Sequence, residues 1–450
     1  MALELDVAAP LASALPAVER RARIPAGFLA GGRVAGIKAS GRPDLALVVA
    51  SGAPAAVAAV FTPNAFAAAP VRRSRAALAA TGGWARAVVS TSGSANAATG
   101  AAGEEDQARV GELVAGALGI AEDEVLHLST GVIGTRLPLD RVAAGLDALV
   151  PELAATDDGL EAVATALRTT DSVTKVATLT VALPDSGGTL HDVRVSGAAK
   201  GVGMIHPRMA TMLSVILTDA AASPGLLAAI LRPAAARTWN QLSVDGDTST
   251  NDTVFLLASG ASPAAPVVAG SPAAAALAAA VEAVARDLAR QQAADGEGAT
   301  CLLTCQVTGA LDDAEARAVA RAVVSSSLVK AAAHGKDPNW GRIAGAAGNA
   351  RLAETAILAA AGLSAEEAFR RGGAPASVDP DRLKIAIAGQ LVFDGAAGGP
   401  VAFDRMAARA AMAASEIVIR LDMGLGDGTG EAFGCDLTEA YVIENSEYTT

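Results

Sequence analysis

The sequence predicts a mixed α/β protein in which parallel strands and hairpins share the same sheets. Short apolar runs alternate with longer segments whose apolar residues have helical spacing, as in α/β proteins. Two strand-like runs at 176–183 and 189–195 flank the sequence PDSGG, which is typical of a hairpin loop and excludes a purely parallel sheet. Hydrophobic residues make up 52 % of the 450 residues, so the chain can bury a large core. This length predicts two to three domains or lobes.

The individual elements follow from local patterns. Residues 1–26 are rich in Ala, Pro and Arg without periodicity, which predicts a loose arm. Elsewhere, short apolar runs predict buried strands, and apolar residues at every third or fourth position predict helices. The predicted strands are 45–49, 87–90, 125–128, 212–218, 302–307 and 416–421, the predicted helices are 104–118, 140–149, 272–292, 314–330 and 406–414, and a second hairpin is predicted over 383–393.

Charge and composition exclude several classes of partner. The net charge is −12 and the pI is about 4.9, so the chain lacks the clustered basic residues that neutralise phosphate, and no nucleic-acid partner is expected. No apolar run reaches the ~18 residues of a membrane span, and the first residues, MALELDVAAP, lack a basic targeting region. Cys301, Cys305 and Cys435 form no disulfide or zinc pattern. A soluble protein of the reducing cytoplasm is therefore expected.

One stretch, GAAKGVGMIHPRMATML at 197–213, is longer and more polar than a connection between two strands requires. It leads to Thr211, directly before a predicted buried strand. Thr211 is interpreted in two ways from the residues alone. It is either a β-branched residue that begins a strand, or a nucleophile exposed by cleavage before it. In the second case its new α-amine, with an ordinary pKa near ~8, could accept the hydroxyl proton without a histidine.

The segment KGVGMIHPRMATML resembles the self-cleavage segment of the ornithine acetyltransferase family, also called the glutamate N-acetyltransferases of the arginine pathway. That family cuts itself between Ala and Thr, here Ala210 and Thr211, and the new N-terminal Thr carries the acetyl group. Further stretches resemble family segments in the same order, from about residue 27 to the end of the chain. They are IKASGRPDLAL (37–47), VFTPNAFAAAPV (60–71), STGVIG (129–134), TTDSVTK (169–175), SVDGDTSTNDT (243–253), DGEGAT (295–300), DPNWGRI (337–343) and DLTEAYVIENSEYTT (436–450).

The resemblance also implies a set of site residues and an architecture. Thr130 and Gly131 of STGVIG correspond to the family's oxyanion hole, where a hydroxyl and a backbone N–H stabilise a tetrahedral oxyanion. The implied substrate-binding residues are Thr169 or its neighbour Thr170, Lys200, Thr211, Glu297, Asn445 and Thr450. The implied fold is a layered α/β/β/α sandwich in two unequal lobes, with a first part at 27–210 and a second part at 211–450. The two parts stay associated, usually as an α2β2 heterotetramer.

The implied reaction moves an acetyl group from N2-acetyl-L-ornithine to L-glutamate by a ping-pong mechanism through acetyl-Thr211. No cofactor is needed, because the acyl donor is itself a substrate. Three alternatives stay open: a bifunctional enzyme that also uses acetyl-CoA, a relative in secondary metabolism with another acyl amino acid, and an uncleaved structural paralogue. Asp245, Asp247 and Asp252 have a spacing like that of metal ligands, but the bidentate Glu of a calcium loop is missing, so no metal is expected.

Overall fold

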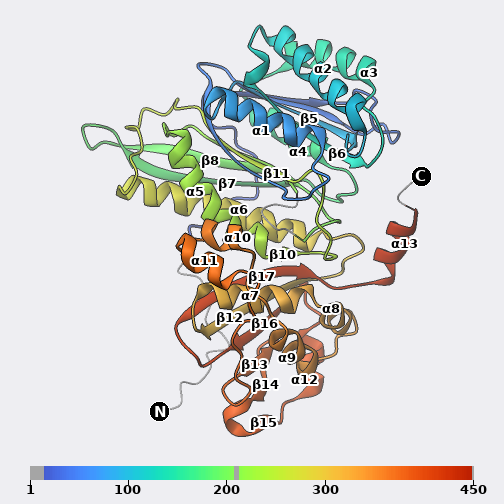
Figure 1. The fold of residues 1–450 in the computed structure, drawn as a ribbon, viewed down its shortest axis with the longest axis vertical. Coiled ribbons are helices and arrows are strands. Elements are labelled where there is room, and N and C mark those ends of the chain that lie inside the picture. The colour runs from blue at the N-terminus through green and yellow to red at the C-terminus, as the bar shows by residue number, and fades with distance from the viewer. Residues whose placement is uncertain (1–14, 207–211, 448–450) are drawn as a thin grey trace.

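The structure is a computed structural model that describes residues 15–206 and 212–447. Figure 1 shows two unequal lobes: an upper lobe built mainly by the first 300 residues, and a smaller lower lobe built by the residues that follow. The described residues form three sheets, two in the upper lobe and one in the lower lobe. The mixed α/β class and the two-lobed arrangement expected from the sequence are confirmed.

The upper lobe has the four layers α/β/β/α. One sheet has the strand order β1-β2-β5-β6, and the second has the order β4-β3-β11-β9-β8-β7. The strands of the first sheet are β1 (Phe28–Arg33), β2 (Leu45–Ala50), β5 (Ala87–Ser94) and β6 (Val125–Val132). Those of the second are β3 (Ala55–Phe61), β4 (Trp84–Ala85), β7 (Lys175–Pro184), β8 (Leu190–Lys200), β9 (Leu213–Thr218) and β11 (Thr253–Ala258). The helices of this lobe are α1 (Ala69–Thr81), α2 (Gly100–Leu118), α3 (Leu139–Leu149), α4 (Asp157–Leu167), α5 (Pro224–Arg237) and α6 (Pro272–Ala294).

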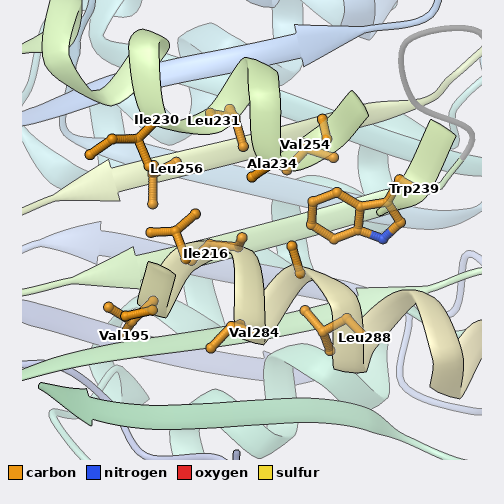
Figure 2. Close-up of a cluster of buried hydrophobic side chains, with 14 of the residues drawn as sticks. Val195, Ile216, Ile230, Leu231, Ala234, Trp239, Val254, Leu256, Val284 and Leu288 are labelled. Carbon is orange, nitrogen blue, oxygen red and sulfur yellow. The ribbon is translucent and has the colours of Figure 1, made fainter. Parts of the chain in front are cut away.

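The layers are held by separate hydrophobic clusters. Between the two sheets, Leu128 and Phe255 belong to one cluster. On the outer face of the second sheet, side chains of β9, β11, α5 and α6 form another, with Trp239 at one end (Figure 2). Alternate residues of β9 serve the two clusters: Val215 lies between the sheets and Ile216 faces the helices, as the two-residue period of a strand requires. Every residue of β9 is therefore buried.

The hairpin predicted around PDSGG is confirmed as β7 and β8, which pair antiparallel from Lys175–Ala199 to Pro184–Leu190. In its turn, the Asp185 carboxylate accepts hydrogen bonds from the backbone N–H groups of Gly187 and Thr189. Strand β9 pairs antiparallel with β8 and in parallel with β11. The second sheet is therefore mixed, and the predicted parts 27–210 and 211–450 each contribute strands to it.

The lower lobe is a seven-stranded sheet with the order β10-β17-β12-β16-β13-β14-β15. Its strands are β10 (Leu242–Ser243), β12 (Leu302–Ala310), β13 (Lys384–Ile387), β14 (Gln390–Asp394), β15 (Gly399–Pro400), β16 (Glu416–Asp422) and β17 (Gly428–Cys435). The remaining helices are α7 (Asp313–Ser325), α8 (Ser327–His334), α9 (Trp340–Gly348), α10 (Thr355–Ala360), α11 (Ala365–Arg371), α12 (Arg405–Ala411) and α13 (Glu439–Glu447). A core that includes Leu303, Val319 and Ile419 joins this sheet to its helices.

The structure corrects one predicted helix. The segment 314–330 is divided into α7 and α8, because Ser326 has extended backbone angles (φ −71°, ψ 116°) and caps α8 by accepting a hydrogen bond from the Val329 N–H. Strands β3 and β11 and helix α5 were not predicted. Ala210, Thr211 and Thr450 lie outside the described residues, so the division at 210/211 stays a prediction. In the part of the chain that is described, no helix combines the length and apolar character of a membrane span.

Candidate functional site

A cavity of about 270 Å³ lies between the end of β6, the end of β8 and the loop that precedes β11. We call this cavity the cleft. It collects every site residue that the sequence predicts within the described chain. The predicted residues that line it are Thr130, Gly131, Thr169, Thr170, Lys200, Glu297 and Asn445. The other predicted residues, Ala210, Thr211 and Thr450, lie outside the described residues. Segments as distant in sequence as 130 and 445 therefore meet at one site.

The first wall of the cleft is uncharged and comes from the ends of β5 and β6. Thr130 is 6 % exposed, and its hydroxyl makes no hydrogen bond to a described residue, so it can donate into the cleft. Gly131 has φ +131°, and a Cβ there would lie 2.3 Å from the Gly93 carbonyl carbon on β5. Only glycine fits this close approach. The Asn251 amide ties the wall together by donating to the carbonyls of Ala95 and Ser129, at 2.6 and 2.8 Å.

The second wall is charged, and Lys200 at the end of β8 is its central residue. The Lys200 Nζ lies 3.5 Å from the Thr169 Oγ1. Burial lowers the pKa of the Lys200 ammonium below its ordinary value, while the nearby carboxylates of Asp171 and Asp252 act in the opposite direction. Removal from water makes such a cation a strong partner for an entering anion.

A buried ion network behind this wall was missed by the sequence analysis. The Lys175 Nζ lies 2.7 Å from Asp171 Oδ1 and 2.6 Å from Asp295 Oδ2, and the Lys175 side chain is fully buried. The Asp171 carboxylate also accepts from the Gly201 N–H at 2.8 Å and the Thr169 N–H at 3.1 Å. It thereby fixes the backbone on both sides of the Thr169–Lys200 contact. The cationic neighbours Lys175 and Lys200 hold the pKa of Asp171 below its ordinary value in spite of burial.

A third group of contacts lies at the other end of the charged wall. The Glu297 carboxylate accepts from the Thr170 hydroxyl at 2.8 Å and from the Asn445 amide at 2.9 Å. The Asn445 contact brings α13, the last helix of the chain, to the cleft. Gly203 leaves room for this carboxylate, because a Cβ there would lie 2.1 Å from Glu297 Oε2. Glu297 thus presents a carboxylate with two polar neighbours, which is a suitable partner for an ammonium group.

Asp252 is a second acid that the sequence analysis did not place at the site. It is 2 % exposed, and its Oδ2 has no hydrogen-bond partner within the described chain. Burial raises its pKa well above the ordinary value for an aspartate. The described residues contain no group of three side chains placed to hold a metal ion. The SVDGDTSTND motif was the available signal, but its aspartates were considered only as metal ligands, and no metal was expected.

Strand β9, which begins soon after the undescribed residues 207–211, starts beside Lys200. Leu213 pairs with Lys200 on β8 and with Thr253 on β11, and the Thr253 N–H donates to the Met212 carbonyl at 2.8 Å. The cleft thus joins hydroxyl and backbone donors, a desolvated cation and a carboxylate. Such a set suits acyl transfer to and from an amino acid.

Comparison with known proteins identifies the family. The ArgJ family model matches residues 29–450. The arginine biosynthesis bifunctional protein ArgJ of Thermus thermophilus is 46 % identical over 428 residues, which cover 95 % of this chain and 99 % of that protein. The protein of the same name from Thermosynechococcus vestitus is 45 % identical over 427 residues, covering 94 % of this chain and 96 % of its own.

Two solved structures are also similar in sequence. The ornithine acetyltransferase of Mycobacterium tuberculosis, complexed with ornithine, is 42 % identical with a TM-score of 0.38, and the match covers 42 % of this chain and 97 % of that one. The arginine biosynthesis bifunctional protein of Bacillus halodurans is 37 % identical with a TM-score of 0.45, and the match covers 52 % and 99 %. The family match over almost the whole length and the full-length relatives above 40 % identity show that this chain belongs to the ArgJ family.

Proposed function

We propose that this chain is a self-processing acetyltransferase that moves the acetyl group of N2-acetyl-L-ornithine to L-glutamate. The observation that carries the proposal is the cleft itself. It brings Thr130 and Gly131 together with Lys200 and Glu297 beside the start of β9. The names of the full-length relatives, which place those proteins in arginine biosynthesis, support the same reaction.

The charges of the cleft match the ends of the donor. The α-carboxylate of acetylornithine is assigned to Lys200, where a desolvated ammonium forms a strong charge-assisted hydrogen bond. The δ-ammonium is assigned to the Glu297 carboxylate, which Thr170 and Asn445 orient. The acetyl carbonyl is then directed to the Thr130 hydroxyl and the Gly131 N–H. Thr169 and Thr170 both line the cleft, and both are kept as substrate contacts.

The same donors serve two acyl transfers. In self-processing, the Thr211 hydroxyl attacks the Ala210 carbonyl, the C–N bond breaks as the nitrogen takes up a proton, and water hydrolyses the resulting ester. In catalysis, the Thr211 hydroxyl attacks the acetyl carbonyl while the Thr211 α-amine accepts its proton. The proton passes to the departing amine of ornithine. Glutamate then attacks the acetyl ester, which gives N-acetylglutamate and free Thr211. The oxyanion of each step is stabilised at Thr130 and Gly131.

The processed protein is proposed to stay assembled. The predicted fragments contribute β8 and β9 to one sheet, where they pair over six positions from Val195–Thr218 to Lys200–Leu213. Separation would expose strands that are buried on both faces, so the fragments should remain associated after cleavage. We keep the α2β2 heterotetramer as the proposed assembly.

A second activity is also proposed, with acetyl-CoA as the acetyl donor to glutamate. The observation that favours it is the word "bifunctional" in the names of the full-length relatives. An acetyl-transfer assay with acetylornithine and acetyl-CoA tested side by side separates the two cases. Turnover with acetylornithine alone would remove the second activity and leave the first.

The processing step is tested by replacing the proposed nucleophile. Thr211→Ala should give one uncleaved band of 44.4 kDa and no transfer, whereas the wild type gives fragments of 210 and 240 residues. Thr211→Ser is the matched control, because it keeps the hydroxyl and should still cleave. With acetylornithine and no glutamate, the fragment that begins at Thr211 should gain one acetyl group, about 42 Da. An active wild type whose fragment never gains this mass would contradict the covalent intermediate.

A further inference from the structure

A second cavity, of about 370 Å³, lies at the junction of the two lobes. Its walls come from the end of α5 and the turn after it in the upper lobe, and from α7 and α10 in the lower lobe, whose positions Figure 1 shows. Among the described residues, it shares no lining residue with the cleft. A cavity of this size at a boundary between lobes is a common place for a small ligand. We call it the arginine cavity, after Arg317, Arg321 and Arg351, which line it.

The charge of the arginine cavity is positive. Among the described residues, three arginines line it against one acid, Glu354, although Arg317 also borders neighbouring cavities lined by Asp312, Asp313 and Glu282. Arg317 is the most informative of them, because its side chain is only 11 % exposed. Its one ion-pair partner among the described residues is Asp313, at 4.0 Å, and the described chain offers its guanidinium no hydrogen bond. A largely buried guanidinium usually binds a carboxylate or phosphate through two parallel hydrogen bonds.

A second, independent feature is an unpaired acceptor. Gln241 is 6 % exposed and lines the same cavity. Its Nε2 donates to the Ala236 carbonyl at 3.2 Å, which fixes the orientation of the amide. Its Oε1 is buried and has no partner in the described chain. Because an unpaired buried acceptor costs free energy, the cavity is suited to a ligand that brings an N–H donor.

We propose that the arginine cavity binds a small carboxylate that also carries an N–H group, the chemistry of a free or Nα-acylated amino acid. The carboxylate pairs with Arg317, and the N–H group donates to Gln241 Oε1. This site is separate from the proposed catalytic cleft and does not depend on the acetyl-transfer mechanism. The ligand bound in the arginine cavity takes no part in the acetyl transfer proposed for the cleft.

The test uses the purified full chain with Lys200→Met, which weakens carboxylate binding in the cleft. Each free proteinogenic amino acid, its Nα-acetyl derivative, acetate and inorganic phosphate are screened by thermal shift, and those that stabilise the protein are titrated by calorimetry. At least one amino acid or acetyl derivative should bind at one site, more tightly than acetate or phosphate. Comparing the affinities of the free amino acids with those of their Nα-acetyl derivatives shows which form the cavity prefers.

Variants then locate the site. Arg317→Met keeps the apolar stem and should weaken binding about tenfold to a hundredfold, the usual effect of losing a charged hydrogen bond. Gln241→Met should bring the affinity for the best probe down to that for acetate, and it serves if Arg317→Met does not fold. Arg370→Met, which changes an exposed arginine outside the cavity, is the control and should bind as before. Unchanged affinity in both cavity variants, no binding by any amino acid or derivative, or equal binding by phosphate and acetate would each overturn the proposal.

Discussion

The two walls of the cleft are built by different physical means. The wall of β5 and β6 is uncharged, and its shape depends on the contact of Gly131 with Gly93 and on the amide of Asn251. The opposite wall depends on the buried charges of Asp171 and Lys175. We therefore expect the first wall to lose its shape when a substitution adds volume, and the second wall to lose its shape when a substitution removes a charge. Substitutions that preserve size or charge separate these two kinds of failure.

The largest effect is expected at Gly131. In Gly131→Ala the new Cβ would meet the Gly93 backbone at 2.3 Å, so β5 and β6 must move apart and the uncharged wall of the cleft loses its shape. We expect loss of both self-cleavage and transfer, measured by denaturing gel and by acetyl transfer. Gly134→Ala is the matched control, because Gly134 also has a positive φ (+83°) but open space around its Cβ position. It should keep activity at a cost of about 1–2 kcal/mol in unfolding free energy.

Asp171→Asn is expected to have the next largest effect, on stability. The substitution keeps the shape of the side chain but leaves Lys175 with Asp295 as its one carboxylate partner among the residues that the structure describes. Breaking a buried ion pair costs about 3–5 kcal/mol in unfolding free energy. Denaturant unfolding should show this loss, while Glu112→Gln, which breaks the exposed Arg109–Glu112 pair on α2, should cost less than about 1 kcal/mol. Equal losses in the two variants would mean that the buried network has no special role.

The buried network is one of several features of the structure that could not be predicted from the sequence. Periodicity predicted α2, α6 and the β7–β8 hairpin, because each has a polar and an apolar side or a clear turn. Strand β11, TVFLLA, was missed, since all its residues are buried and an unbroken apolar run does not distinguish a strand from a helix. The boundary between α7 and α8 was missed because Ser326 caps a helix inside a segment that otherwise has good helical spacing.

The candidate site was predicted from motifs and not from periodicity. Thr130, Lys200 and Glu297 stood in recognisable segments, and the structure brings them together. Asp171 and Lys175 were also inside a quoted segment, but their burial depends on Asp295, which is 120 residues from Lys175 in the sequence. A local pattern contains no information about such a distant partner. The same limit applies to Asp252, whose unpaired Oδ2 is visible only once its neighbours are placed.

Thr130→Ala addresses the uncharged wall without adding volume. It removes the one hydroxyl proposed for the oxyanion hole and should slow both self-cleavage and transfer about 10²–10³-fold, or about 3–4 kcal/mol of barrier. Thr135→Ala is the control, because its hydroxyl donates to the Val132 carbonyl and does not line the cleft. Time courses of cleavage and kcat for transfer measure the two effects. Slow transfer with normal cleavage would make Thr130 a substrate contact instead.

The smallest effect is expected at Lys38, which connects the two walls. Its backbone N–H lies beside Gly93, and its Nζ donates to the Pro43 carbonyl at 2.6 Å and to the carbonyl of Arg168, next to Thr169. Burial lowers the pKa of the Lys38 ammonium to about 8, against an ordinary value of ~10.4. Between these two values the unfolded chain binds more protons than the folded one, so the contribution of Lys38 to stability rises with pH over that range.

The comparison with Lys38→Met isolates most of this contribution, because Lys200 is the one lysine that interacts electrostatically with Lys38 among the causes of its shift. From pH 7.5 to 9.5 the Tm of the wild type should rise relative to that of the variant, by about 1–2 °C once solvent screening of the partly exposed amine is allowed for. Below pH 7.5 the difference should be flat, since Lys38 is then charged in both states. A wild type that loses Tm relative to the variant over this range would mean that the Asp44 carboxylate and the carbonyls of Pro43 and Arg168 stabilise the ammonium more than burial destabilises it.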